Sequence, residues 1–222
     1  MSMPYYVSPE QVIADKAEFA SKGIKRGRSV IVQSCNDGIL FVADNPSRAL
    51  HKVGEIYDRI GFAAVGKYNE FESLRVAGVR LADMRGYSYD RADVTVRTIA
   101  NAYAQTLGSI FIDAAKPYEV EIAVAEVGAD VDHDQLYRIS FDGSVHDQAG
   151  FICMGGDSES MSASISEEFR IDHSVSEALK VAIMVLRGDA PHDDLEIAFL
   201  DRSRPRRTFV RFDQSHIADL VK

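Results

Sequence analysis

The chain has 222 residues, 46% of them hydrophobic, so it can bury a core without disulfides or metal ions. Acidic residues outnumber lysine and arginine by 34 to 25, which argues against nucleic acid or an anionic membrane as a partner. No apolar stretch approaches the ~20 residues of a bilayer span, and the first residues lack a secretory signal. We therefore expect a cytoplasmic protein with no nucleic-acid or membrane partner.

No metal site and no cofactor are expected. Cys35 and Cys153 lie far apart and match no metal spacing, so buried free thiols in a reducing compartment are predicted. Residues 130–134 alternate carboxylates as a calcium loop does, but Gln135 replaces its turn glycine and Phe141 its bidentate glutamate. The potential metal ligands at 192–194, which include a histidine, have no second cluster to complete a site.

The first predicted element is a helix over residues 8–23. Ser8 is a favourable N-cap, Pro9 suits the first helical position, and Gln11 completes a capping-box pattern. Val7 and a second valine occupy the positions of a hydrophobic staple, and Gly23 is expected to end the helix. One half of the helix is apolar and needs a cover; it carries Val12, Ile13, Ala17, Phe19 and Ala20.

Four short strands are predicted next. Residues 29–35 and 39–44 form two β-rich runs separated by Asn36-Asp37-Gly38, a hairpin signal. Both runs have a continuously apolar interior, which indicates that sheet covers one face and helices the other. Residues 56–60 and 62–65 predict a second pair of strands.

The rest of the chain alternates pairs of helices with groups of strands. The predicted elements are helix 69–85, a second helix capped by Asp93, strands 120–127, 137–141 and 151–154, two further helices, and strands 195–200 and 208–212. The last helix follows a capping box formed by Ser174 and Glu177 and ends at Gly188. Because alternating βα units are absent, two packed sheets with helices outside are expected.

Six short strings, together with this order of elements, resemble the proteasome α subunits, in the bacterial, actinobacterial-type branch. The strings are SPEQ at 8–11, GILFVA at 38–43, SRALHK at 47–52, IYDRIGFAAVG at 56–66, NEF at 69–71 and YEVE at 118–121. The resemblance covers nearly the whole chain. It implies an α+β fold, the four-layer α-β-β-α sandwich of the N-terminal nucleophile hydrolases, with an extra N-terminal helix.

The same family contains active β subunits, so the catalytic alternative must be considered. An N-terminal nucleophile enzyme needs Thr, Ser or Cys as its first mature residue, because the freed amino group is the general base. Ser29 begins the equivalent strand but follows Arg28 instead of the usual glycine, and Glu55 lies near the place of the lysine that tunes the nucleophile. No catalytic residue is expected; a β-type or stand-alone hydrolase using Ser29, or Cys35, is the alternative.

The resemblance implies a noncatalytic subunit that forms a homo-heptameric ring, gates the chamber of a β-subunit ring and docks an ATPase activator. Lys52 matches the basic residue that receives the activator's C-terminal carboxylate between neighbouring α subunits. The helix at 69–85 would face the β ring. Substrates would be unfolded proteins or proteins tagged with a ubiquitin-like modifier. The gate would be Met1, Ser2, Met3, Pro4, Tyr5, Tyr6 and Val7.

Three parts of the chain are expected on this basis. Residues 1–7 form the gate leader. Residues 8–212 form a single α-β-β-α sandwich domain that includes the N-terminal helix at 8–23. Residues 213–222 form a C-terminal tail. The composition shows no linker long enough to divide the central domain.

Overall fold

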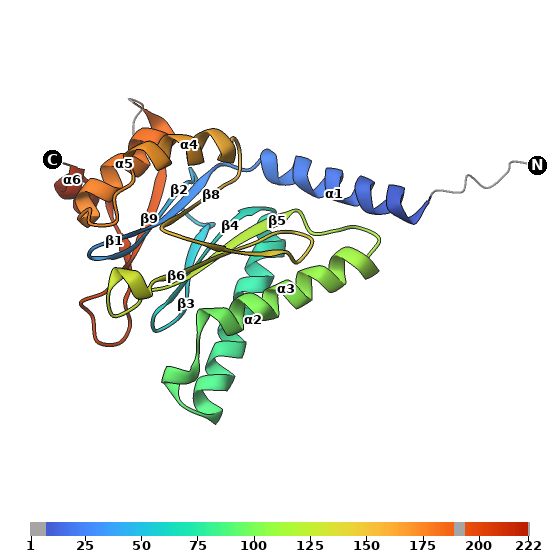
Figure 1. Ribbon diagram of the computed structural model, residues 1–222, viewed down its shortest axis with the longest axis horizontal. Helices are drawn as coiled ribbons and strands as arrows, with labels where there is room; N and C mark the ends of the chain where they lie inside the picture. The colour runs from blue at the N-terminus through green and yellow to red at the C-terminus, as the bar shows by residue number, and fades with distance from the viewer. Residues whose placement is uncertain (1–7, 189–193, 222) are drawn as a thin grey trace, which may run out of the picture.

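The computed structural model describes residues 8–188 and 194–221. Two five-stranded antiparallel sheets pack face to face, and helices cover both outer faces (Figure 1). Helices α2 (Tyr68–Ser88) and α3 (Val96–Asp113) lie on one sheet, and α4 (Ser158–Glu168) and α5 (Val175–Arg187) lie on the other. The predicted four-layer α-β-β-α sandwich with an extra N-terminal helix is confirmed.

Each sheet collects strands from both halves of the chain. The first sheet has the order β10-β9-β2-β1-β8, formed by β10 (Phe209–Phe212), β9 (Leu195–Asp201), β2 (Gly38–Asp44), β1 (Val30–Cys35) and β8 (Phe151–Met154). The second has the order β3-β4-β5-β6-β7, formed by β3 (Val53–Tyr57), β4 (Ile60–Gly66), β5 (Val120–Glu126), β6 (Gln135–Ile139) and β7 (Val145–Gln148).

The second pair of strands differs from its prediction. The turn between β3 and β4 lies at Asp58 and Arg59, whereas the sequence placed it at Gly61. Gly61 lies inside β4, where a Cβ atom would come within 2.5 Å of the Phe41 ring on the other sheet. Gly61 therefore permits a close approach between the two sheets and does not mark a turn.

Other differences concern exposed or short elements. Strand β7 was not predicted, because its residues are mostly exposed at the sheet edge and show no alternation. Asp93 does not cap α3: it lies in the short 3-10 helix η1 (Arg91–Asp93), and Thr95 caps α3 by accepting from the Thr98 N–H. A second 3-10 helix, η2 (Val131–His133), lies in the acidic loop, where Asp130 accepts from the His133 N–H.

The N-terminal helix α1 (Pro9–Lys25) is longer than predicted. Ser8 accepts from the Gln11 N–H at 3.2 Å, so the N-cap is confirmed, but the Gln11 side chain donates to Asp15 and the capping box is not completed. Gly23 does not end the helix. A Cβ atom there would lie 2.7 Å from the Glu119 carboxylate, so this glycine allows α1 to approach the start of β5. Val7 of the predicted staple lies outside the described residues.

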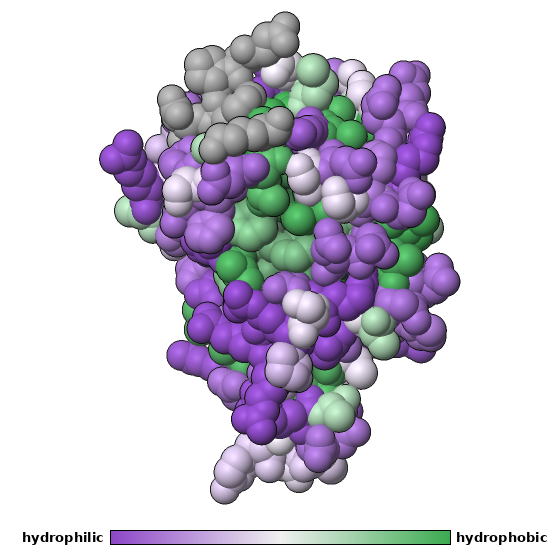
Figure 2. All heavy atoms as spheres, turned by 90° about the vertical axis from the view of Figure 1, so that its left-hand side faces the viewer, coloured by the Kyte–Doolittle hydropathy of each residue, from purple (hydrophilic) through white to green (hydrophobic). Residues whose placement is uncertain are grey.

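The last described helix, α6 (Gln214–Val221), occupies the segment expected to be a tail. The Asp213 carboxylate accepts from the His216 N–H at 2.9 Å and from the Ser215 hydroxyl at 2.6 Å, as an N-cap does. Ile217 is buried against α5. The apolar spacing of Ile217, Leu220 and Val221 was the sequence signal for this helix. The face on this side of the molecule is mostly hydrophilic, with hydrophobic residues gathered near its middle (Figure 2).

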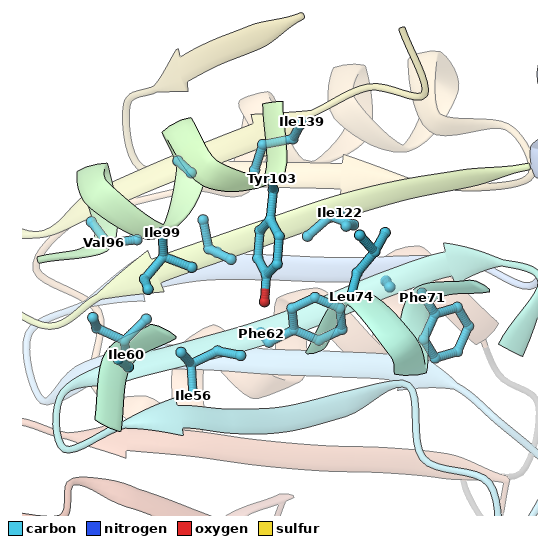
Figure 3. Close-up of a cluster of buried hydrophobic side chains, with 14 of the residues drawn as sticks. Ile56, Ile60, Phe62, Phe71, Leu74, Val96, Ile99, Tyr103, Ile122 and Ile139 are labelled. Atoms are coloured by element: carbon cyan, nitrogen blue, oxygen red, sulfur yellow. The ribbon is translucent and has the colours of Figure 1, made fainter. Parts of the chain in front are cut away.

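The core has three layers, one between the sheets and one beneath each pair of helices. Figure 3 shows the layer under α2 and α3, where Tyr103 reaches from α3 toward Phe62 of β4. The two rings meet edge to face with centroids 6.1 Å apart. The Tyr103 hydroxyl has no hydrogen-bond partner among the described residues, and burial raises its pKa. The apolar layer under α2 and α3 therefore packs around the Tyr103 hydroxyl oxygen.

Candidate functional site

Lys52 lies where the chain crosses from one sheet to the other. After β2 the segment 45–52 leaves the first sheet, and Val53 then begins β3 at the edge of the second. Polar side chains shape this crossing: the Asn45 amide donates to the Leu50 carbonyl at 2.7 Å, and the Ser47 hydroxyl accepts from the Leu50 N–H at 3.0 Å. These local bonds replace ladder bonds and fix the turn.

The Lys52 ammonium reaches back to the entrance of β1. Its Nζ donates to the Arg28 carbonyl at 2.6 Å. Partial burial lowers the pKa of Lys52 to about 8, while the carboxylates of Asp44 and Glu196 favour its charged form. An ammonium has three N–H groups, and this is its one hydrogen bond within the described chain. Lys52 can therefore offer a partly desolvated positive charge to an anion.

The surrounding charges reinforce that role. Asp44 accepts from Arg28 at 3.0 Å and from Arg187 at 2.7 Å, so two guanidinium groups share its charge. Arg28 is half exposed, and its charge opposes the protonation of Lys52. The Glu196 carboxylate binds the backbone N–H of Lys52 at 2.8 Å. Glu196 was not predicted from the sequence, where its signal is an acidic residue between the apolar residues of β9.

The site is open on one side. A hollow of about 850 Å³ lies beside the crossing segment, lined in part by Asn45, Arg48, His51 and Arg211. A second hollow of about 680 Å³ shares His51 and Arg211 and is bounded by β3 and α2. Lys52 lines neither hollow. Within residues 8–188 and 194–221, a single chain therefore supplies the charge and one wall, without an enclosed pocket around the Lys52 ammonium.

The start of β1 bears on the catalytic alternative. Helix α1 runs into β1 through Gly27, whose N–H donates to the Ile24 carbonyl at 2.8 Å and whose carbonyl accepts from Gly156 at 3.2 Å. The Ser29 carbonyl accepts from the Asp44 N–H at 2.9 Å. In the full-length chain the Ser29 nitrogen is an amide between α1 and β1, so self-processing would have to free it before it could act as the general base of this chemistry.

Two side chains bear on the expectation that an acid replaces the tuning lysine. Glu55 was placed near the position of a tuning lysine, but its carboxylate pairs with Arg207 at 2.7 Å. The lysine that lies at the entrance of β1 is Lys52, which bonds the residue before Ser29. A lysine at the entrance of β1 therefore does not separate the two hypotheses.

The apolar half of α1 is largely uncovered in the single chain. Figure 1 shows α1 projecting away from the sandwich. Ala20 and Ile24 are buried, whereas Val12, Ile13 and Phe19 are 41%, 56% and 46% exposed, so the sandwich covers mainly the C-terminal turns of this half. Polar contacts attach the helix instead, because the Lys16 ammonium donates to the carbonyls of Phe111 and Ile112 at the end of α3.

The remaining candidates are the two cysteines, the potential metal ligands and the gate residues. Cys35 and Cys153 are buried and free, as predicted, and burial raises the pKa of each thiol to about 11. In the described part of the chain, no three histidine, cysteine or acidic side chains are grouped to hold a metal ion. None of the described helices is long and apolar enough to cross a membrane. The gate residues Met1 to Val7, and His192, lie outside the described residues.

Comparisons with known proteins agree with this geometry. The family profile described as "Proteasome subunit" matches residues 24–196. Three curated relatives named "Proteasome subunit alpha" are each 56% identical and cover all of this chain: those of Sanguibacter keddieii, Kineococcus radiotolerans and Thermomonospora curvata, over 90%, 98% and 98% of their own lengths. The chain therefore belongs to the proteasome subunit family and, within it, to the α subunits.

Proposed function

We propose that this chain is noncatalytic and that seven copies form a ring that gates the proteolytic chamber of a β-subunit ring. The observation that carries the proposal is the place of α1. It stands in front of β1, where an N-terminal nucleophile enzyme presents a free amino group. The substrates would be unfolded or ubiquitin-like-tagged proteins of the cytoplasm.

The exposed half of α1 supports the ring. Val12, Ile13 and Phe19 project an apolar surface from a helix that lies outside the sandwich. Covering apolar surface of this kind lowers the free energy of the protein in water. A neighbouring copy, brought by a seven-fold rotation, would supply the cover. Helix α2, which lies on the outer face of the second sheet, would face the β ring.

Lys52 would receive the C-terminal carboxylate of an ATPase ring. Its ammonium keeps N–H groups for a ligand, and a cation that receives a chain terminus is a common mode of peptide recognition. The open side of the site fits a pocket between two subunits, with this chain as one wall. Docking of the activator there would be coupled to opening of the gate.

Removing residues 1–7 is expected to raise the rate at which the assembled α–β complex hydrolyses short peptides several-fold, because the axial entrance would no longer be occluded. Fluorogenic peptide hydrolysis measures this. A chain whose first seven residues are replaced by a Gly-Ser segment of equal length is the control for leader length. Equal rates for the full-length and truncated complexes would contradict the gate assignment.

Intact mass of the chain purified from the assembled complex tests the catalytic alternative. We expect a mature chain that begins at Met1 or Ser2, because Ser29 lies in a hydrogen-bonded segment between α1 and β1. A Ser29→Ala variant should keep the same N-terminus, with a mass lower only by the oxygen atom that the substitution removes, and should leave peptide hydrolysis unchanged. A chain that begins at Ser29 would instead establish self-processing and overturn the noncatalytic assignment.

A further inference from the structure

Glu196 is a buried carboxylate in a position that the fold would fill with an apolar residue. Along β9, Ala198 and Leu200 belong to the layer between the sheets, and strand alternation places Glu196 on their face. Its side chain is only 7% exposed. Burial of a carboxylate is costly unless its oxygens are hydrogen-bonded. The bonds that offset this cost therefore indicate what Glu196 holds in place.

All but one of these bonds lead to residues 45–53, the segment around Lys52; the remaining bond comes from Arg211 of β10. Oε2 accepts from the Asn45 amide at 2.7 Å and from the Lys52 N–H at 2.8 Å. Oε1 accepts from the Val53 N–H at 3.3 Å, and His51 Nδ1 lies 3.1 Å from it. Glu196 thus binds the chain before and after the crossing, and it binds two successive backbone N–H groups at the point where Lys52 leaves the backbone.

Arg211 of β10 completes the attachment. One of its guanidinium nitrogens bonds Glu196 Oε1, and the other donates to the Val53 carbonyl at 2.9 Å. Glu196 and Arg211 both come from the first sheet, whereas Val53 begins the edge strand of the second. The pair therefore satisfies both backbone groups of Val53 and joins the two sheets at this edge.

Lys52 is consequently held at both ends. Its backbone is fixed by Glu196 of the first sheet, and its ammonium by the Arg28 carbonyl. We propose that Glu196, supported by Arg211, is the positioning residue of the activator-docking site: it sets where the Lys52 ammonium meets a carboxylate. This inference rests on the proposed docking function of Lys52.

The test uses the assembled α–β complex and two synthetic peptides with the C-terminal sequence of the ATPase subunit, one with a free carboxylate and one amidated. Fluorescence anisotropy gives both dissociation constants. The dissociation constant of the amidated peptide divided by that of the free-carboxylate peptide measures recognition of the carboxylate alone. We expect Glu196→Gln to reduce this ratio about tenfold, since the amide cannot accept all the bonds that fix Lys52. A general loss of stability would weaken the binding of both peptides equally and leave the ratio of their dissociation constants unchanged.

Glu126→Gln is the matched control, because Glu126 is a partly buried carboxylate of β5 that accepts from the Val96 N–H at 2.8 Å, away from Lys52. Its ratio should equal that of the wild type. If Glu196→Gln does not assemble, Arg211→Lys, which keeps the charge but loses the paired bonds, should still reduce the ratio. A wild-type ratio in the assembled Glu196 or Arg211 variant overturns the positioning role. A wild-type ratio in Lys52→Ala overturns the docking function itself.

Discussion

Replacing Lys52 with alanine is expected to weaken binding of an activator's C-terminal carboxylate about a hundredfold, while the α–β complex still assembles. The ammonium is partly desolvated and supplies the positive charge of the site. Its loss removes the charge that would pair with the incoming carboxylate. Anisotropy with a labelled C-terminal peptide measures the dissociation constant. Lys180→Ala, at an exposed lysine of α5, is the control and should bind as the wild type does.

The pH dependence of carboxylate binding is a second test of the Lys52 ammonium. Burial lowers the pKa of Lys52 to about 8, so the free site loses its charge as the pH rises through that value. Carboxylate binding should therefore be strong below pH 8 and should weaken above it. Lys52→Arg should keep its affinity at alkaline pH, because a guanidinium stays charged. A wild-type affinity that does not change across this range would contradict a docking role for the ammonium.

Replacing Gly78 with alanine is expected to lower the free energy of unfolding by about 3 kcal/mol, the upper range for overpacking of a core. A Cβ atom at this position of α2 would lie 2.0 Å from the Tyr103 hydroxyl oxygen and 2.7 Å from its ring. Tyr103 cannot move aside easily, because it is buried and packs edge to face against Phe62 (Figure 3). The helix must therefore shift away from the second sheet.

Gly108→Ala in α3 is the matched control, because it is the same change in a helix with room for the methyl group. The nearest atom to its Cβ would be the Asp142 carbonyl oxygen at 3.6 Å, an ordinary contact. Alanine favours the helix over glycine, so this variant should gain up to about 1 kcal/mol. Urea unfolding followed by circular dichroism at one protein concentration measures both changes. A Gly78→Ala variant as stable as the wild type would contradict the packing around Tyr103.

Adding Tyr103→Phe to Gly78→Ala should recover part of the lost stability. The substitution removes the hydroxyl that collides most closely with the new methyl group, although the ring carbon at 2.7 Å remains. It also removes a buried oxygen that has no partner among the described residues.

The sequence was sufficient to predict the layers of this fold, because strong local signals define the core elements. The hairpin of β1 and β2 follows from two apolar runs around Asp37-Gly38, and both strands are buried as expected. The capping box of Ser174 and Glu177 is present at the start of α5, and Gly188 ends that helix with a positive φ of 56°. These features depend on residues that are neighbours in sequence.

Features that depend on distant contacts could not be predicted. The sequence predicts a helix end at Gly23 and a turn at Gly61, whereas in the structure Glu119 and Phe41 approach these glycines from other elements. The candidate site is the same kind of feature. Its cation, Lys52, was identified by family resemblance, but its bond to Arg28 and its support by Glu196 join three segments that meet only in the folded chain.

We propose that this chain builds a seven-membered ring on a β-subunit ring. Negative-stain electron microscopy of the chain co-expressed with its β subunit tests it most directly. We predict stacked rings with seven-fold symmetry in end views, in which a neighbouring copy would cover the exposed apolar half of α1. Particles without seven-fold rings would contradict the account.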